Sequence, residues 1–236
     1  MPVYQLPDEP IFPHPQLAEP DGLLAIGGDL SVDRLIQGYA TGVFPWYNEE
    51  EPILWWSPDP RFILYPDQLK VSKSMKQVLR RKTFEITYDQ DFGQVIRNCQ
   101  QIPRPGQAGT WITPDMIAAY EALHQEGWAH SVEVWQQGQL VGGLYGVSLG
   151  TCFFGESMFA KVSNASKAGF ITLIQDLKAA NFQLIDCQIY TAHLASLGAT
   201  SISRLTFLEH LNAFLEHQSI RGNWGDFFKK STFSRE

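Results

Sequence analysis

The sequence contains little of what metal, redox or disulfide chemistry requires. Only three cysteines occur among 236 residues, at positions 99, 152 and 187, and no two form a CxxC pair. Three widely spaced cysteines fit reduced thiols better than a disulfide framework or a zinc site. The six histidines form no HxxxH or HExxH pattern, so no metal site is expected.

Long apolar runs are absent as well. No run reaches the roughly 18 residues that a membrane span needs. The N-terminal segment MPVYQLPDEPIFPHP carries acids and prolines where a signal peptide needs a basic start and an apolar stretch. With 44% hydrophobic and 18% charged residues, the chain has the composition of an ordered globular protein. A cytoplasmic protein with no membrane contact is expected.

Two patterns associated with well-known catalytic loops are incomplete. The glycine-rich LVGGLYGVSLG lacks the GK[ST] of a phosphate-binding loop and opens no helix. In GESMF, Phe159 stands where a GxSxG nucleophile elbow needs glycine, which argues against Ser157 as the nucleophile of a hydrolase. Glu156 in this apolar stretch either turns to water at the end of a strand or lies in a cleft to meet a cation.

Basic residues are fewer than acidic ones, 18 against 25, yet six of them gather between positions 70 and 82 with no acid among them. On a helix, Lys73, Lys76 and Arg80 would share one face, with Arg81 beside them. A solvated helix face is the ordinary explanation of such a run. A stripe of one sign, however, repels itself unless a polyanion neutralises it. The stripe therefore predicts contacts with a phosphate backbone.

The stretch LIDCQ predicts a strand with two polar side chains on one face. Alternation places Asp186 and Gln188 on the same side and Ile185 and Cys187 on the other. Asp186 and Gln188 either make buried structural hydrogen bonds or hold and orient an amine. Cys187 has no basic neighbour in sequence, so a small buried hydrophobe is expected rather than a nucleophile.

The order of expected elements predicts an α+β or mixed α/β fold. Residues 1–66 are rich in proline, glycine and aromatics and predict a small N-terminal domain, followed by a larger domain over 67–236. In the first domain Ser31 caps a helix that Gly42 ends. The second has helices over 71–81, 92–101, 113–126, 164–180 and 204–217, strands over 84–88, 130–136, 139–147, 150–156 and 183–188, and a loop over 104–109.

Several long strings together resemble the leucyl/phenylalanyl-tRNA–protein transferase family. They run in order between about Phe12 and Phe233. The strings are PDGLLAIGGDLSVDRLIQGYATGVFPWY (20–47), PILWWSPDPR (52–61), GTWIT (109–113), HSVEVW (130–135), GESMF (155–159), NASK (164–167), LIDCQ (184–188) and ASLGA (195–199).

The resemblance implies a small N-terminal domain and an N-acetyltransferase-like (GNAT-like) catalytic domain. Members move Leu or Phe, and Met less efficiently, from aminoacyl-tRNA to the N-terminal amine of proteins beginning with Arg or Lys. This marks the acceptor for N-end rule degradation. Because the acyl donor is already an activated ester, no cofactor and no metal are expected.

The resemblance also assigns roles to residues. Asp186 and Gln188 would hold and polarise the acceptor amine, with Glu156 nearby to position it and complement the cation. The acceptor of the amine proton stays open between Asp186, a water and a ribose hydroxyl. Trp46 and Trp111, with Tyr39 nearby, would pack around the terminal adenosine. The candidates for the aminoacyl pocket are Leu144, Phe153, Phe170 and Ile185.

Two alternatives come from other functional classes. In the first, the protein is a non-catalytic RNA-binding module whose Asp186 and Gln188 are structural. In the second, it is an N-acyltransferase that uses a CoA thioester. The second lacks its cofactor signature, because no [QR]xxGx[GA] loop leads into a helix after the central strands.

Overall fold

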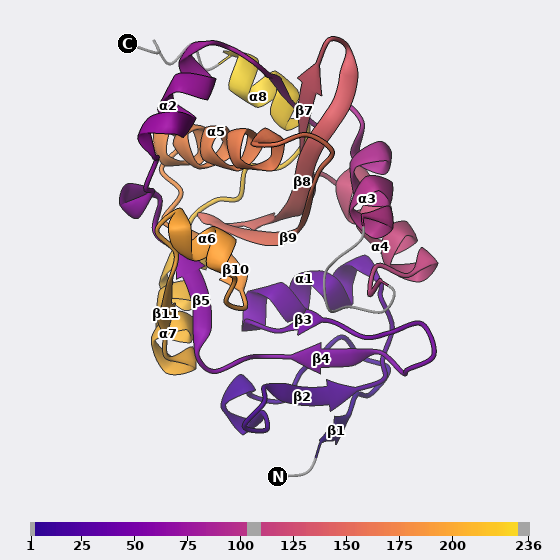
Figure 1. Cartoon of the computed structure of the whole chain (residues 1–236). Coiled ribbons are helices and arrows are strands. Elements are labelled where there is room, and N and C mark those ends of the chain that lie inside the picture. The colour runs from indigo at the N-terminus through magenta and orange to yellow at the C-terminus, as the bar shows by residue number, and fades with distance from the viewer. Residues whose placement is uncertain (1–2, 103–109, 231–236) are drawn as a thin grey trace.

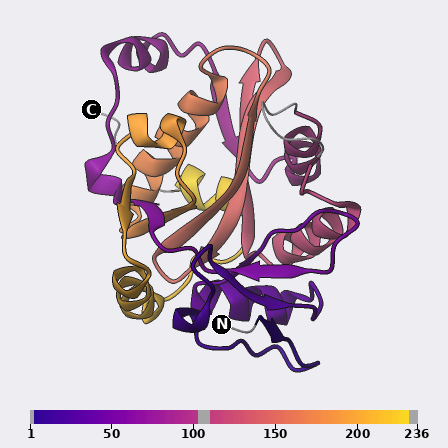
Figure 2. The same ribbon diagram turned by 60° about the horizontal axis from the view of Figure 1, so that its bottom comes forward.

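The computed structural model describes residues 3–102 and 110–230 (Figure 1). The predicted loop 104–109, including Gly109 of GTWIT, lies outside the described residues, as does Phe233. The described chain forms a four-stranded and a seven-stranded sheet. Figures 1 and 2 show the N-terminal part lying against one end of the larger sheet.

The smaller sheet carries one helix. Its strand order is β1-β2-β4-β3, with β1 at Tyr4–Gln5, β2 at Leu23–Ile26, β3 at Phe44–Pro45 and β4 at Leu54–Trp56. Helix α1 (Val32–Thr41) begins where the Ser31 hydroxyl accepts a hydrogen bond from the Arg34 amide. It ends at Gly42, whose φ of 82° is the left-handed conformation that glycine adopts without strain. The predicted helix is confirmed at both ends.

The larger sheet has the order β11-β5-β10-β9-β8-β7-β6. Strands β6 to β9 form an antiparallel meander, β10 runs parallel to β9, and β5 pairs antiparallel with β10 and β11. The strands are β5 (Arg61–Leu64), β6 (Glu85–Tyr88), β7 (Ala129–Gln136), β8 (Gln139–Leu149), β9 (Cys152–Ala160), β10 (Leu184–Gln188) and β11 (Thr200–Ile202).

Helices cover both faces of the meander. Gly142 in β8 abuts Ala165 at the start of α5, whereas its neighbour Gly143 abuts Val95 of α3, so α5 and α3 lie on opposite faces. No helix in the described stretches is long and apolar enough to span a membrane. The helices are α2 (Lys73–Arg80), α3 (Phe92–Gln101), α4 (Pro114–Gln125), α5 (Ala165–Ala179), α6 (Ala192–Ser196), α7 (Arg204–Leu215) and α8 (Trp224–Lys230), with short 3-10 turns at Pro15–Leu17 and Pro66–Gln68.

The expected α+β fold class is confirmed, with a small N-terminal part followed by a larger part. The N-acetyltransferase-like character of the larger part stays a prediction. Strand β5 belongs to the larger sheet although it precedes residue 66. The division into domains at residues 66 and 67 stays a prediction.

Candidate active site

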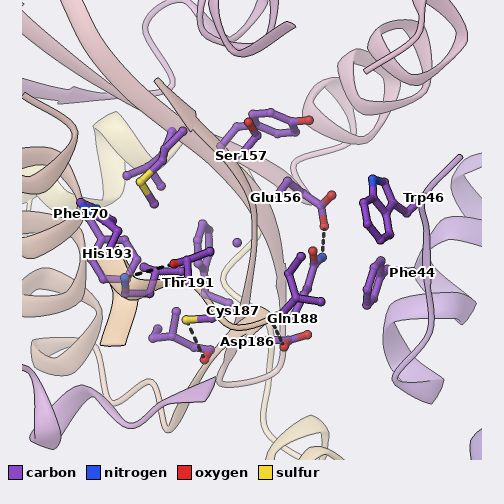
Figure 3. A pocket seen from close by; sticks show the side chains of 18 of the residues that line it. Phe44, Trp46, Glu156, Ser157, Phe170, Asp186, Cys187, Gln188, Thr191 and His193 are labelled. Carbon is purple, nitrogen blue, oxygen red and sulfur yellow. Dashed lines mark hydrogen bonds between the residues drawn. The ribbon is translucent and has the colours of Figure 1, made fainter. Parts of the chain in front are cut away.

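A pocket with a cavity volume of about 560 Å³ opens where β9 and β10 meet the N-terminal part. Phe44 and Trp46 of the N-terminal part face Glu156 and Gln188 across it (Figure 3). Strands β8, β9 and β10 and helices α5 and α6 supply most of the remaining wall. A site between two sheets with one apolar and one polar region is a common place for a ligand.

The apolar region contains all four predicted aminoacyl-pocket residues. Leu144, Phe153, Phe170 and Ile185 come from β8, β9, α5 and β10, and each lines the cavity. Little of any of the four is exposed, so their side chains form a firm wall rather than a mobile surface. Met158 and Leu194 extend this wall. Its chemistry suits an apolar side chain.

Glu156 and Gln188 form the polar region. The Gln188 Nε2 donates to Glu156 Oε1 at 2.8 Å, and the Tyr39 hydroxyl donates to the same oxygen at 2.7 Å. The Tyr120 hydroxyl donates to Glu156 Oε2 at 3.1 Å and also contacts the Tyr39 hydroxyl. Three donors therefore fix the carboxyl group of Glu156, and Gln188 keeps its Oε1 as an acceptor.

Burial controls the protonation of this network. It raises the pKa of Glu156 to about 7, although its hydrogen bonds from Tyr39, Tyr120 and Gln188 act in the opposite direction. Burial also raises the pKa of Tyr39 and of Tyr120 well above the usual value, with the Glu156 charge acting in the same direction. The tyrosines thus remain donors, while Glu156 can take or release a proton near neutral pH.

Gln188 lies in a strained turn at the end of β10. Its φ of 62° is rare for a residue with a side chain. The Ile189 amide donates to the Cys187 carbonyl at 2.7 Å, which closes a γ-type turn around Gln188. The pairing of β10 with β5 also shifts register between Asp186 and Gln188. The predicted strand alternation therefore ends at this point.

Asp186 lines the cavity, but its carboxylate is paired with Arg61. The Arg61 Nε donates to Asp186 Oδ1 at 2.9 Å and the Nη2 to Oδ2 at 2.6 Å. Asp186 Oδ1 also accepts from the Gln188 amide at 2.9 Å. The Asp186 side chain is 0% and the Arg61 side chain 1% exposed. The two residues form a buried, bidentate ion pair, of which Asp186 lines the pocket and Arg61 does not.

The predicted aromatic residues occupy two different environments. Trp46 is 37% exposed and lines the pocket, as does the largely buried Trp111. The Trp56 indole donates to the Trp46 carbonyl at 2.6 Å and so holds Trp46 in place. Tyr39 is buried behind Glu156 and is not part of the cavity wall. Of the three, Trp46 and Trp111 line the pocket, and their contact with the terminal adenosine stays a prediction.

The thiol in the pocket is not reactive. Cys187 lines the cavity, and burial raises its pKa, so the thiol stays protonated as the sequence predicts. Within residues 3–102 and 110–230, no group of three or more His, Cys, Asp and Glu side chains is arranged to hold a metal ion.

Helix α2 presents the basic stripe to solvent. Lys73, Lys76, Arg80 and Arg81 lie on its outer side, and all four are exposed. The opposite face is apolar: Met75 is buried in the core, and Val78 and Leu79 pack against the same cluster. The predicted orientation of this helix is confirmed. Its contact with a phosphate backbone stays a prediction.

Sequence reasoning missed Arg61 and Tyr120. Both are buried and both hold a carboxylate of the site, yet they lie 125 and 36 residues from their partners. The sequence holds one hint for Arg61, since it ends the string PILWWSPDPR that carries the family resemblance. Pairing it with Asp186 required the fold.

Comparisons with known proteins agree on one family. Residues 63–212 match the model of "Leucyl/phenylalanyl-tRNA protein transferase", and residues 28–59 match that of its N-terminal domain. Two curated relatives carry the name leucyl/phenylalanyl-tRNA–protein transferase. The one from Maridesulfovibrio salexigens is 57% identical over 95% of this chain and 94% of its own. The one from Syntrophus aciditrophicus is 56% identical with the same coverage.

Solved structures are more distant. The structure of L-PGS from Bacillus licheniformis is 13% identical, with a TM-score of 0.40 over 85% of this chain and 66% of that chain. A likeness at that level carries no argument about function. The family match covers more than half of the chain, and both relatives cover nearly all of it. This chain therefore belongs to the leucyl/phenylalanyl-tRNA–protein transferase family and is a transferase.

Proposed function

We propose that the enzyme moves Leu or Phe, and Met less efficiently, from aminoacyl-tRNA to the N-terminal amine of proteins beginning with Arg or Lys. The observation that carries the proposal is the apolar cavity that adjoins the Gln188–Glu156 pair. The products would enter N-end rule degradation in the cytoplasm. Neither a cofactor nor a metal is needed, because the aminoacyl ester is already activated.

The cavity would select the amino acid by shape. Leu144, Phe153, Phe170 and Ile185 would surround its side chain. A methylene is worth only about 1 to 3 kcal/mol in such a pocket, so Leu, Phe and Met would be poorly distinguished. The terminal adenosine would stack on Trp46 and Trp111, at about 1 to 3 kcal/mol per stacked base.

Gln188 would orient the attacking amine. Its Nε2 is committed to Glu156, which leaves Oε1 to accept a hydrogen bond from the amine. The amine nitrogen then attacks the ester carbonyl, a C–N bond forms, and the C–O bond to the ribose breaks. Orientation of this kind lowers the entropy cost of a reaction between two substrates.

Glu156 is the proposed acceptor of the amine proton. Its pKa of about 7 allows it to be ionised at neutral pH, and it lines the same cavity as Gln188. The ribose oxygen that leaves takes up a proton in turn. Asp186 is not assigned this step, because Arg61 and the Gln188 amide already occupy its carboxylate.

The role of Glu156 predicts a pH dependence. Below about pH 7 Glu156 is protonated and cannot accept a proton, so kcat at saturating aminoacyl-tRNA is expected to rise with pH through this value. The acceptor amine itself titrates at about 7.7 to 8.0. Profiles of kcat against pH for wild type and Glu156→Gln distinguish the titration of Glu156 from that of the acceptor amine. The variant is expected to keep only the amine titration.

Unfolding measurements provide a control for that assignment. Because the folded-state pKa of Glu156 is raised, the native state binds more protons than the unfolded state, and this contribution to stability is lost as pH rises toward 7. Glu156→Gln lacks the group, so its stability relative to wild type is expected to improve between about pH 4.5 and 7. A constant difference across that range would contradict the raised pKa.

Helix α2 would bind the tRNA backbone. Replacing Lys73, Lys76 and Arg80 with Ala is expected to weaken tRNA binding for every tRNA sequence. The slope of log K against log salt should become shallower by about one for each phosphate that the variant no longer neutralises. Filter binding over a salt series measures this. Arg97→Ala is the matched control, because Arg97 is an exposed basic residue on α3 that forms an ion pair with Glu121. An unchanged salt slope in the triple variant would contradict the assignment.

One assay tests the proposed function against its alternatives. Radiolabelled Leu-tRNA or Phe-tRNA is incubated with the enzyme and a peptide that begins with Arg, and label in the peptide is counted. Transfer supports the proposal. Binding of tRNA without transfer would indicate an RNA-binding module, and acylation that occurs only with a CoA thioester would indicate an N-acyltransferase of the CoA-dependent class.

A further inference from the structure

Arg61 lies buried where three parts of the protein meet. Beyond its two hydrogen bonds to Asp186, its Nη1 donates to the carbonyl of Gly42 at 3.2 Å. The rings of Phe44 and Phe207 flank the guanidinium, with centroids 4.8 and 4.4 Å from its central carbon. Arg61 is not among the residues that line the cavity. It therefore acts on the site only through its neighbours.

One of those neighbours governs the conformation of Gln188. The same Asp186 oxygen that accepts from the Arg61 Nε accepts from the Gln188 amide. That hydrogen bond holds the residue whose φ is 62°. A backbone in this region persists only when its surroundings hold it. Arg61 fixes Asp186, and Asp186 in turn fixes the turn that aims the Gln188 side chain at Glu156.

Two other interactions of Arg61 are with the N-terminal part, which forms the wall of the pocket opposite Gln188. Gly42 ends α1, the helix that carries Tyr39, and Tyr39 donates to Glu156. Phe44 begins β3 and faces the pocket (Figure 3). Arg61 thus connects the end of α1, the helix whose Tyr39 binds Glu156, with β10, the strand that ends at Gln188.

We infer that Arg61 is a positioning residue that fixes the orientation of Gln188 and its alignment with the N-terminal wall of the pocket. The planar guanidinium makes the two parallel bonds to Asp186, reaches the Gly42 carbonyl and stacks between two rings at the same time. The ammonium group of lysine cannot reproduce this arrangement. The inference rests on the proposed function in that Gln188 is taken as the residue that orients the amine.

A double-mutant cycle between Arg61 and Gln188 tests the inference. Arg61→Lys keeps the charge beside Asp186 and is expected to lower kcat by about a hundredfold, since small misplacements of reacting groups have effects of this size. Affinity for Phe-tRNA is expected to stay within about twofold of wild type. In a Gln188→Ala background the same change is expected to cost less than about twofold, because there is no side chain left to position. An equal loss in both backgrounds would overturn the inference.

Arg204→Lys is the matched control. Arg204 is also a buried arginine, but its Nη1 donates to the Ser57 carbonyl at 2.6 Å and its backbone amide to Asp59 at 3.0 Å. Any loss that it causes is expected to be the same with and without Gln188. Should Arg61→Lys fail to fold, Arg61→Ala with guanidinium ion added below denaturing concentration replaces it. Recovery of kcat by guanidinium supports the inference, and no recovery in a folded variant opposes it.

An NMR measurement separates this inference from the proposed function. The backbone amide resonance of Gln188 is expected to shift in Arg61→Lys and to stay in place in Arg204→Lys, whatever the enzyme transfers. If wild type transfers no amino acid but the Gln188 resonance shifts, the proposed function fails and the positioning role stands. If wild type transfers and Arg61→Lys leaves both kcat and the Gln188 resonance unchanged, the positioning role fails.

Discussion

Replacing Gln188 with Ala is expected to lower kcat for aminoacyl transfer by at least about a hundredfold while affinity for aminoacyl-tRNA is retained. Among the described residues that line the cavity, Gln188 donates to Glu156 and keeps an acceptor, Oε1, for the amine. The variant loses orientation in the reaction step, whereas the aminoacyl cavity and Trp46 stay intact. Single-turnover transfer at saturating Phe-tRNA measures kcat, and filter binding measures the affinity.

Gln183→Ala serves as the control for this variant. Gln183 is exposed just before β10, and its side-chain amide donates to the nearby Asn181 carbonyl at 3.3 Å. Its replacement is expected to leave both quantities unchanged. A Gln188→Ala enzyme that kept wild-type kcat, or lost tRNA affinity and kcat in equal measure, would show that Gln188 does not orient the amine.

Replacing Asp186 with Ala is expected to reduce the free energy of unfolding by about 3 to 5 kcal/mol. The change leaves the Arg61 guanidinium buried without its carboxylate, and a buried unpaired charge is much costlier than a missing pair. Activity is expected to fall as well, because the Gln188 amide loses its acceptor. Urea unfolding monitored by tryptophan fluorescence gives the stability.

Removing both charges tests whether that loss has the stated cause. The double variant Asp186→Leu with Arg61→Met is expected to be more stable than Asp186→Ala, since no buried charge is left unpaired. Its kcat should nevertheless stay low, because nothing then holds the turn at Gln188. If the double variant were less stable than Asp186→Ala, the buried charge would not be the source of the loss.

Helices are more predictable from the sequence than strands, for a physical reason. Ser31 and Gly42, or Thr113 and Pro114, are local signals that begin or end a helix within a few residues. The strands of the N-terminal sheet are two to four residues long and are interrupted by prolines and turns, so they have no periodicity to detect. In the larger sheet, partners such as β5 and β10 lie far apart in the chain.

The residues of the candidate site show the same contrast between local sequence signals and partners that are distant in the chain. The four candidates for the aminoacyl pocket, Leu144, Phe153, Phe170 and Ile185, all line the cavity. What local strings cannot give is the partner of each buried polar group. Tyr39 is expected near the terminal adenosine, yet in the fold it is buried and donates a hydrogen bond to Glu156. The sequence leaves Asp186 open between a structural and an amine-binding role, and only the fold reveals its partner Arg61.

Identifying the nitrogen that becomes acylated tests most directly whether the enzyme transfers amino acids to N-terminal amines. Phe-tRNA, the enzyme and a peptide that begins with Arg and carries an internal lysine are combined, and the product is sequenced by mass spectrometry. We expect one added Phe, attached to the N-terminal nitrogen, and no product from the same peptide with an acetylated N-terminus. Addition to the internal lysine, or no addition by wild type under conditions in which it binds Phe-tRNA, would contradict this expectation.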